Sequence, residues 1–318
     1  MGRIAFVLLP FSWQDYAAYF PGGLKWPRFV WEKTRRFLPV LRVGEFGWQS
    51  PFANVQGDFI YCPLPKKEFA HFSSELISLK RQKAIKLAEK TARFWGISPY
   101  LAIGEPHETV GYNYQLFVLG QNVREAVELL APRKISIVIW GAAAPLGKIA
   151  ARLLAQKNKT IILADLELGE LEKLAAQILY ESGLVVKITT RINQVLAEAS
   201  IIVLASELPP NFYLPAASLI FNLILPGNSW VKAKGLLTVL EEMWVELPPG
   251  VSWEPFFPPG HCPAFWAGTL LSALQKEVVE GKVTLPQVEK MGELGQRHGF
   301  RPQSLRKLIV KKTGFLGG

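Results

Sequence analysis

Five short apolar runs separated by amphipathic stretches constrain the fold of this chain more than any other feature of its sequence. The runs are ISIVIW (135–140), TIILAD (160–165), LVVKIT (184–189), SIIVLAS (200–206) and SLIFNLIL (218–225). Apolar runs without polar alternation are typical of strands that are covered on both faces. Stretches with helical spacing, such as LGKIAARLLAQ (146–156), lie between them, and helices between successive strands imply right-handed crossovers in a parallel sheet. The pattern therefore predicts a doubly wound α/β domain over residues 132–250.

The rest of the chain is long enough for further structure on either side of this domain. At 318 residues the chain exceeds the roughly 250 to 300 residues at which single cores stop growing. Residues 1–131 contain strand-like pieces, a helix over 75–95 that is expected to stop at Gly96, and a second helix over 114–130. We expect an N-terminal α/β domain on the substrate side of a cleft, and C-terminal helices with a basic tail (251–318) that pack back against it.

A loop with a glycine at each end follows the first apolar run. Gly141 ends the run, Gly147 lies at the start of the next helix and Ala144 stands between them, so the pattern is G-x-x-A-x-x-G. In Rossmann sheets such a turn lets the backbone approach a pyrophosphate, and the helix points its N-terminal amides at the phosphates. The sequence therefore predicts a parallel Rossmann sheet that binds a dinucleotide. The expected cofactor-binding residues are Gly141, Ala142, Ala144, Pro145, Leu146, Gly147, Asp165, Ala205, Ser206 and Asn222.

An acid ends the second apolar run. Asp165 follows Gly141 by 24 positions, close to the spacing of about 20 positions at which such sheets place the carboxylate that binds the adenosine ribose. A carboxylate at this position repels a 2′-phosphate, so NAD is the expected cofactor and NADP the alternative. A simpler role for Asp165 is also open, because an acid here suits the N-cap of the following helix.

Composition argues against several other classes of protein. The two cysteines, Cys62 and Cys262, form no CxxC or Cys/His cluster, so we expect neither a disulfide framework nor a metal site. No run approaches the roughly 20 apolar residues of a spanning helix, and we expect a cytoplasmic protein. The net charge of +10 fits an acidic partner or plain solubility. Without a helix-turn-helix, zinc-finger or RNA-binding signature, no nucleic-acid partner is expected.

Several segments taken together resemble one enzyme family. They are KAIKLAEKTARFWGISPYLAIG (83–104), the segment 109–123 with Gly111, the loop 141–147, ASIIVLASELP (199–209) and VTLPQVEKMGELGQRHGFRP (283–302). In these the chain resembles the long-chain acyl-carrier-protein reductases, whose dinucleotide domain is akin to those of shikimate or quinate dehydrogenase and glutamyl-tRNA reductase. The resemblance implies an NAD(P)-dependent reduction of an acyl thioester (acyl-ACP or acyl-CoA) to an aldehyde through a cysteine thioester, and an acidic carrier protein as partner.

The same resemblance implies a cysteine nucleophile at the start of the helix AFWAGTLLSALQ. An ungapped alignment places Ala264 at the family's position, and Cys262 lies two residues earlier. Pro263 suits a first helical turn, so a helix dipole at Cys262 would lower the pKa of the thiol, and His261 beside it would help as base or cation. Alternatively, Cys262 is a small buried hydrophobe and His261 caps a turn.

Two departures leave other functions open. Relatives carry Asp-Gly-Gly-Tyr-Pro where this chain has NLILP (222–226), and the large side chains put hydride transfer in doubt because glycine gives open backbone near the nicotinamide. One alternative is therefore a catalytically altered NAD(P)-binding protein that acts as a sensor or partner subunit. Another is a shikimate- or quinate-type dehydrogenase, although its Asn-Val-Thr-Xaa-Pro-Xaa-Lys and Asn-Thr-Asp motifs are missing. The nearest fragment, GYNYQ (111–115), lacks the acid.

Overall fold

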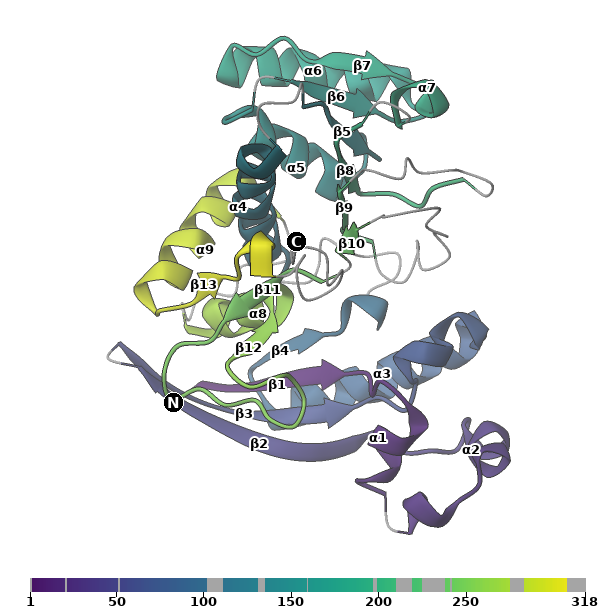
Figure 1. The fold of residues 1–318 in the computed structure, drawn as a ribbon. Coiled ribbons are helices and arrows are strands. Elements are labelled where there is room, and N and C mark those ends of the chain that lie inside the picture. The colour runs from purple at the N-terminus through teal and green to yellow at the C-terminus, as the bar shows by residue number, and fades with distance from the viewer. Residues whose placement is uncertain are drawn as a thin grey trace, which may run out of the picture.

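The computed structural model describes residues 2–20, 22–50, 52–101, 111–130, 135–158, 160–196, 199–209, 219–224, 238–240, 242–274 and 283–307, which form three sheets and the helices around them (Figure 1). The strands are β1 (Gly2–Leu8), β2 (Leu41–Ser50), β3 (Ala53–Tyr61), β4 (Phe94–Ile97), β5 (Ile137–Trp140), β6 (Ile161–Ala164), β7 (Lys187–Thr189), β8 (Ile201–Leu204), β9 (Leu219–Asn222), β10 (Thr238–Leu240), β11 (Trp244–Glu246), β12 (His261–Pro263) and β13 (Arg301–Pro302). The α-helices are α1 (Trp13–Ala17), α2 (Arg28–Thr34), α3 (Ser74–Thr91), α4 (Tyr112–Leu130), α5 (Pro145–Ala155), α6 (Leu168–Ser182), α7 (Ile192–Leu196), α8 (Ala264–Leu274) and α9 (Leu285–Arg297). The short 3-10 helices are η1 (Gly23–Lys25), η2 (Lys66–His71) and η3 (Pro99–Leu101). Within the described residues, no helix has the length and apolar character that a membrane crossing requires.

The N-terminal sheet has four strands in the order β2-β3-β1-β4. β1 runs parallel to both β3 and β4, whereas β2 is antiparallel to β3. α3 packs against β1, β3 and β4. Its fully buried Lys80 donates hydrogen bonds from Nζ to the carbonyl oxygens of Arg36 and Leu38, at 2.9 and 2.5 Å. Because three of the strands are parallel, their carboxyl ends meet at one edge of this sheet.

The helix expected over 75–95 is shorter than its periodicity predicts, which corrects the sequence expectation. α3 ends at Thr91, because Ala92 takes an extended conformation, and β4 begins at Phe94. Gly96 is therefore a strand residue and not a helix stop. A Cβ on Gly96 would lie 2.5 Å from the Thr269 side chain, so this glycine allows β4 to pack closely on α8. Residue spacing alone does not distinguish a short buried strand from the end of a helix, which explains the difference.

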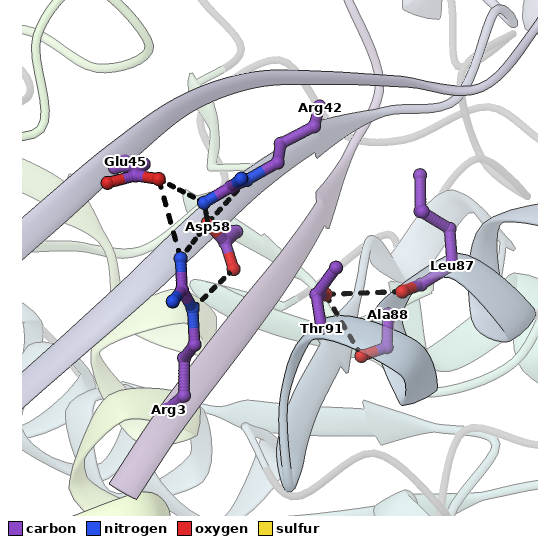
Figure 2. Close-up of polar contacts among 7 residues, drawn as sticks. All are labelled: Arg3, Arg42, Glu45, Asp58, Leu87, Ala88 and Thr91. Carbon is purple, nitrogen blue, oxygen red and sulfur yellow. Dashed lines mark hydrogen bonds and ion pairs between the residues drawn. The ribbon is translucent and has the colours of Figure 1, made fainter. Parts of the chain in front are cut away.

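An ion-pair cluster joins three strands of the N-terminal sheet (Figure 2). Asp58 on β3 is fully buried and accepts hydrogen bonds from Arg3 Nε at 3.0 Å and from Arg42 Nε at 2.7 Å. Glu45 on β2 forms ion pairs with both guanidinium groups from the outer side. The hydrogen bond to Asp58 and the negative charge of Asp58 raise the pKa of Arg3. Two arginines thus compensate a buried carboxylate, and the cluster fixes β1, β2 and β3 relative to one another.

The six-stranded sheet confirms the predicted doubly wound fold. Its order is β10-β9-β8-β5-β6-β7 and its strands pair in parallel. Counted from the sequence, this is the 3-2-1-4-5-6 order of dinucleotide-binding sheets, whose strand order reverses next to the first strand. All residues of β5, β8 and β9 are buried, as expected for central strands covered on both faces. The switch in strand order therefore lies between β5 and β8.

The C-terminal helices pack back on the rest of the molecule, as predicted. α4, α8 and α9 pack against one another, and α8 also contacts β1 and β4 of the N-terminal sheet. The third sheet, β12-β11-β13, is antiparallel and joins β11 to strands that come later in the chain. In this sheet β11, which precedes residue 250, pairs with β12 and β13, which follow it. The domain boundaries expected at residues 131 and 250 stay a prediction.

Candidate active site

The turn after β5 requires glycine for two separate reasons. Gly141 has a φ of +75°, in the left-handed region that side chains disfavour. A Cβ at this position would also lie 2.4 Å from Ser206 Oγ and 2.5 Å from the Ser206 backbone nitrogen. The Gly141 N–H donates to the Ala164 carbonyl oxygen at 3.0 Å, which ties the turn to the end of β6. The turn is therefore held tightly between the ends of β6 and β8.

The N-terminus of α5 packs directly on this turn. A Cβ on Gly147 would lie 2.0 Å from the Gly141 carbonyl oxygen. Ala144 is the N-cap and Pro145 the first helical residue. The Lys148 N–H donates back to the Ala144 carbonyl oxygen at 2.9 Å, and the amides of Leu146 and Gly147 precede this helical ladder, as at any helix start. At the positive end of the helix dipole, these two amides can bind a phosphate group.

Asp165 directly follows β6, and backbone amides hold its carboxylate. Oδ2 accepts a hydrogen bond from the Ala143 N–H at 2.9 Å, and Oδ1 accepts from the N–H groups of Leu166 and Glu167 at 2.7 and 3.4 Å. The N-cap of α6 is Glu167, so Asp165 is not the helix cap that the simpler interpretation expected. A carboxylate has about four lone-pair sites, and these three bonds leave room for a ribose hydroxyl.

The charged side chains beside the turn are already paired. Lys148 Nζ and Lys173 Nζ each donate to Glu170, on different carboxylate oxygens and both at 2.7 Å. These hydrogen bonds from Lys148 and Lys173, together with their charges, lower the pKa of Glu170 to about 2, so Glu170 is ionised at neutral pH. Within the described residues, the two lysines that contact Glu170 are thus compensated by its charge.

The loops after β8 and β9 complete this edge of the sheet. The Ala205 N–H donates to the Trp140 carbonyl oxygen at 2.8 Å, and the Trp140 indole N–H donates to the Glu207 carbonyl oxygen at 3.0 Å. Asn222, at the end of β9, is buried, and its Oδ1 accepts from the Ile224 N–H at 3.2 Å. Of the altered NLILP segment, residues 225 and 226 lie outside the described residues. The expected cofactor-binding residues thus come from the carboxyl ends of β5, β6, β8 and β9.

A cavity of about 250 Å³, here called the Lys66 cavity, lies at the carboxyl edge of the N-terminal sheet. Its described charged and polar lining includes Asp15, Lys66, Ser98 and Glu242. Lys66 Nζ donates to Glu242 Oε1 at 2.9 Å and lies 5.4 Å from the centroid of the Tyr100 ring. Both side chains of the ion pair are about a quarter exposed, at 24% and 27%. The cavity therefore presents a partly buried ammonium group with a carboxylate beside it.

The Lys66–Glu242 pair joins the two larger sheets. Lys66 follows β3, and its N–H donates to the Pro10 carbonyl oxygen at 2.9 Å, next to the end of β1. Glu242 follows β10, which runs parallel to β9 and lies on the side of the six-stranded sheet nearest the N-terminal sheet (Figure 1). β10 lies three strands from β5, on the order of 14 Å at about 4.8 Å per spacing. The glycine turn and the Lys66 cavity thus share one edge of the six-stranded sheet.

Cys262 and His261, the nucleophile and base expected from the sequence, lie in β12 directly before α8. Cys262 lies in β12 opposite Val245 and is fully buried. Burial raises the pKa of the Cys262 thiol well above its usual range, although a hydrogen bond from the Ala267 backbone acts in the opposite direction. Successive side chains of a strand point to opposite faces, so His261 points away from the thiol. Its Nδ1 donates to the Pro259 carbonyl oxygen at 2.8 Å. This arrangement opposes a thiolate with a neighbouring base.

Several other polar groups have little or no signal in the sequence. Lys66 and Glu242 are 176 positions apart and belong to no motif, so the ion pair becomes visible only in the fold. Asn113 and Gln115 belong to the GYNYQ fragment at the start of α4; both are buried, and their side-chain oxygens have no hydrogen-bond partner in the described structure. No group of three or more His, Cys, Asp or Glu side chains in the described part of the chain is arranged to hold a metal ion.

Comparisons with known proteins find distant structural likeness and nothing closer. No protein-family model and no curated protein matches the chain. A solved shikimate dehydrogenase in complex with NADP+ is 13% identical, with 94% of this chain and 96% of that one covered and a TM-score of 0.35. Quinate dehydrogenase from Corynebacterium glutamicum in complex with NAD is 13% identical, with coverages of 93% and 98% and a TM-score of 0.37. L-tryptophan dehydrogenase from Nostoc punctiforme is 13% identical, with coverages of 98% and 86% and a TM-score of 0.36. Likeness at this level assigns no ligand or activity, which therefore rest on the chain's own residues.

Proposed function

We propose that this chain is an NAD(P)-dependent oxidoreductase that acts on a small molecule in the Lys66 cavity. One observation carries the proposal. A glycine turn and a carboxylate, Gly141 and Asp165, lie at the carboxyl edge of a 3-2-1-4-5-6 sheet, where the strand order reverses. Dinucleotides bind at this place in such sheets. The tight packing of Gly147 on Gly141 supports the same conclusion, because dinucleotide-binding turns use a glycine at this position to let the helix pack closely on the strand end.

The geometry of the edge orients the cofactor. The amides of Leu146 and Gly147 would hold the pyrophosphate, and Asp165 Oδ2 would accept a hydrogen bond from an adenosine ribose hydroxyl. The carboxyl ends of β8, β9 and β10 lie between this turn and the Lys66 cavity and would line the path of the nicotinamide half. NAD is favoured over NADP, because Asp165 and Glu170 repel a 2′-phosphate while Glu170 occupies the neighbouring lysines.

The Lys66 cavity supplies the groups for proton transfer. When bound, the nicotinamide supplies or accepts the hydride. Lys66 Nζ donates a proton to the substrate oxygen during reduction and takes it back during oxidation. Glu242, at 2.9 Å from Nζ, orients the ammonium group toward the cavity. Lys66 is therefore the proposed catalytic acid and base, and Glu242 a positioning residue.

Two neighbouring lysines test this proposal. Lys66→Met removes the proposed acid, whereas Lys67→Met removes a lysine that lies 4.4 Å over the Phe11 ring. NADH binding is followed by fluorescence, and turnover by NADH oxidation with a panel of small ketones and aldehydes. We expect both variants to bind NADH like the wild type. Only Lys66→Met should lose activity, by about a hundredfold or more in kcat. Full activity of Lys66→Met would remove Lys66 from the mechanism, and a wild type that binds no NADH would remove the proposal.

Further measurements distinguish the proposed function from the other functions that the sequence predicts. NADH binding without oxidation by any carbonyl compound would favour the catalytically altered NAD(P)-binding protein. Reduction of an acyl thioester through Cys262, with an acidic carrier protein as partner, stays a prediction, and the buried thiol with its raised pKa does not favour it.

A further inference from the structure

Aromatic rings form much of the wall of the Lys66 cavity. The rings belong to Phe11, Tyr61, Trp244, Phe256, Phe257 and Trp266. The Phe256 centroid lies 4.2 Å from that of Phe59 and 5.7 Å from that of Tyr61, so the ring is held on two sides. Trp266 is buried against Phe6, with 5.3 Å between centroids. A rigid aromatic wall favours a ligand with a flat ring.

The charged groups of the cavity are already compensated. Lys66 pairs with Glu242, and Asp15 Oδ2 accepts hydrogen bonds from both the N–H and the hydroxyl of Ser12, at 2.7 and 2.8 Å. Within the described lining, two carboxylates thus face one ammonium group. A carboxylate ligand would share the single positive charge of Lys66 with Glu242 and would also meet the negative charge of Asp15. A neutral oxygen needs only one of the three donors of Lys66 and leaves the ion pair intact.

We propose that the Lys66 cavity takes an uncharged carbonyl compound or alcohol with a flat aromatic body, and that Glu242 is the residue that excludes carboxylic acids. This inference rests on the proposed function and names the substrate class of the same cavity. Glu242 acts by keeping Lys66 occupied and by repelling a second carboxylate. Such rejection through an unfavourable charge is a general way to obtain specificity.

A matched pair of probes tests the proposal. Phenylacetone and phenylpyruvate share the aromatic ring and the ketone, and differ by a methyl group against a carboxylate. Each is titrated by calorimetry into the free protein and into the protein with NAD+, which cannot reduce a ketone. We expect the wild type to bind phenylacetone about tenfold more tightly or better, and Glu242→Gln to reduce this ratio by about tenfold through tighter binding of phenylpyruvate.

A second acid provides the control for charge alone. Glu246 on β11 pairs with Lys307 at 3.0 Å and does not line the cavity. Glu246→Gln makes the same change in net charge and should leave the binding ratio unchanged. Tighter binding of phenylpyruvate by the wild type, binding of neither probe, or a wild-type ratio in Glu242→Gln would each overturn the inference. The separate NADH titration tests the proposed function, so the two failures are distinguishable.

Discussion

The two halves of the candidate site differ in how their residues are distributed along the chain. Gly141, Gly147 and Asp165 belong to one strand–helix–strand unit, and backbone hydrogen bonds within that unit fix their positions. In the Lys66 cavity, Lys66 follows β3 and Glu242 follows β10, so its geometry exists only when two sheets pack together. Replacement of one glycine should therefore disrupt the turn and abolish cofactor binding. A substitution in the Lys66 cavity, in contrast, can abolish catalysis and leave the fold intact.

Of the substitutions considered, Gly147→Ala should have the largest effect on stability and on NADH binding. The added Cβ would lie 2.0 Å from the Gly141 carbonyl oxygen, so helix and turn must separate. We expect a loss of about 3 kcal/mol in the free energy of unfolding and a loss of NADH affinity of about a hundredfold or more. Urea unfolding and a fluorescence titration measure the two quantities.

Gly169→Ala is the control for this substitution. Gly169 lies in α6, and a Cβ there would contact nothing within 4 Å. We expect unchanged NADH binding and a stability unchanged or raised by up to about 1 kcal/mol. Equal behaviour of the two variants would show that the turn does not need a bare glycine at position 147.

Asp58→Ala should lower the stability of the protein without changing its affinity for NADH. Removing this buried carboxylate leaves Arg3 and Arg42 with the exposed Glu45 as their shared partner, and we expect a loss of about 2 to 3 kcal/mol in the free energy of unfolding. NADH affinity should not change, because the cluster lies in the other sheet. Glu45→Ala, on a side chain that is 66% exposed, should cost less than about 1 kcal/mol. A strong loss of NADH binding in Asp58→Ala would mean that the two sheets do not act independently.

Asp165→Asn should have a smaller effect, confined to the cofactor. The amide keeps the shape but loses the charge that, in the proposed function, binds a ribose hydroxyl and repels a 2′-phosphate. We expect NADH to bind about tenfold more weakly and the preference over NADPH to shrink. Glu167→Gln, on an exposed side chain two residues later, should leave both affinities unchanged. An unaltered NADH affinity in Asp165→Asn would exclude the ribose contact.

Cys262→Ala should have the smallest effect. The thiol is buried and its pKa is raised, so we expect unchanged NADH binding and turnover. Intact-protein mass after incubation with a long-chain acyl-CoA should show no acyl adduct on the wild type. An adduct on the wild type that is absent from Cys262→Ala would restore the thioester mechanism that the sequence suggests.

The same contrast explains how much of the molecule could be predicted. The order of apolar runs and the glycine turn predicted the parallel sheet, because strand burial and turn geometry depend on neighbouring residues. The strand β4 was hidden at the end of a helical pattern, since Phe94 and Trp95 fit either structure until α8 packs on Gly96. Cys262 lies directly before α8, near the N-cap as the sequence predicts, but its strand pairing with Val245 appears only in the third sheet. Lys66 and Glu242 had no signal, because long-range packing alone brings them together.

The most direct test of the central claim is a titration of the wild-type protein with NADH and with NADPH, followed by nucleotide fluorescence. The account predicts saturable binding at one site per chain, with NADH bound about tenfold more tightly than NADPH or better. Absence of saturation with either nucleotide up to about 1 mM would contradict the assignment of the glycine turn and Asp165 to a dinucleotide.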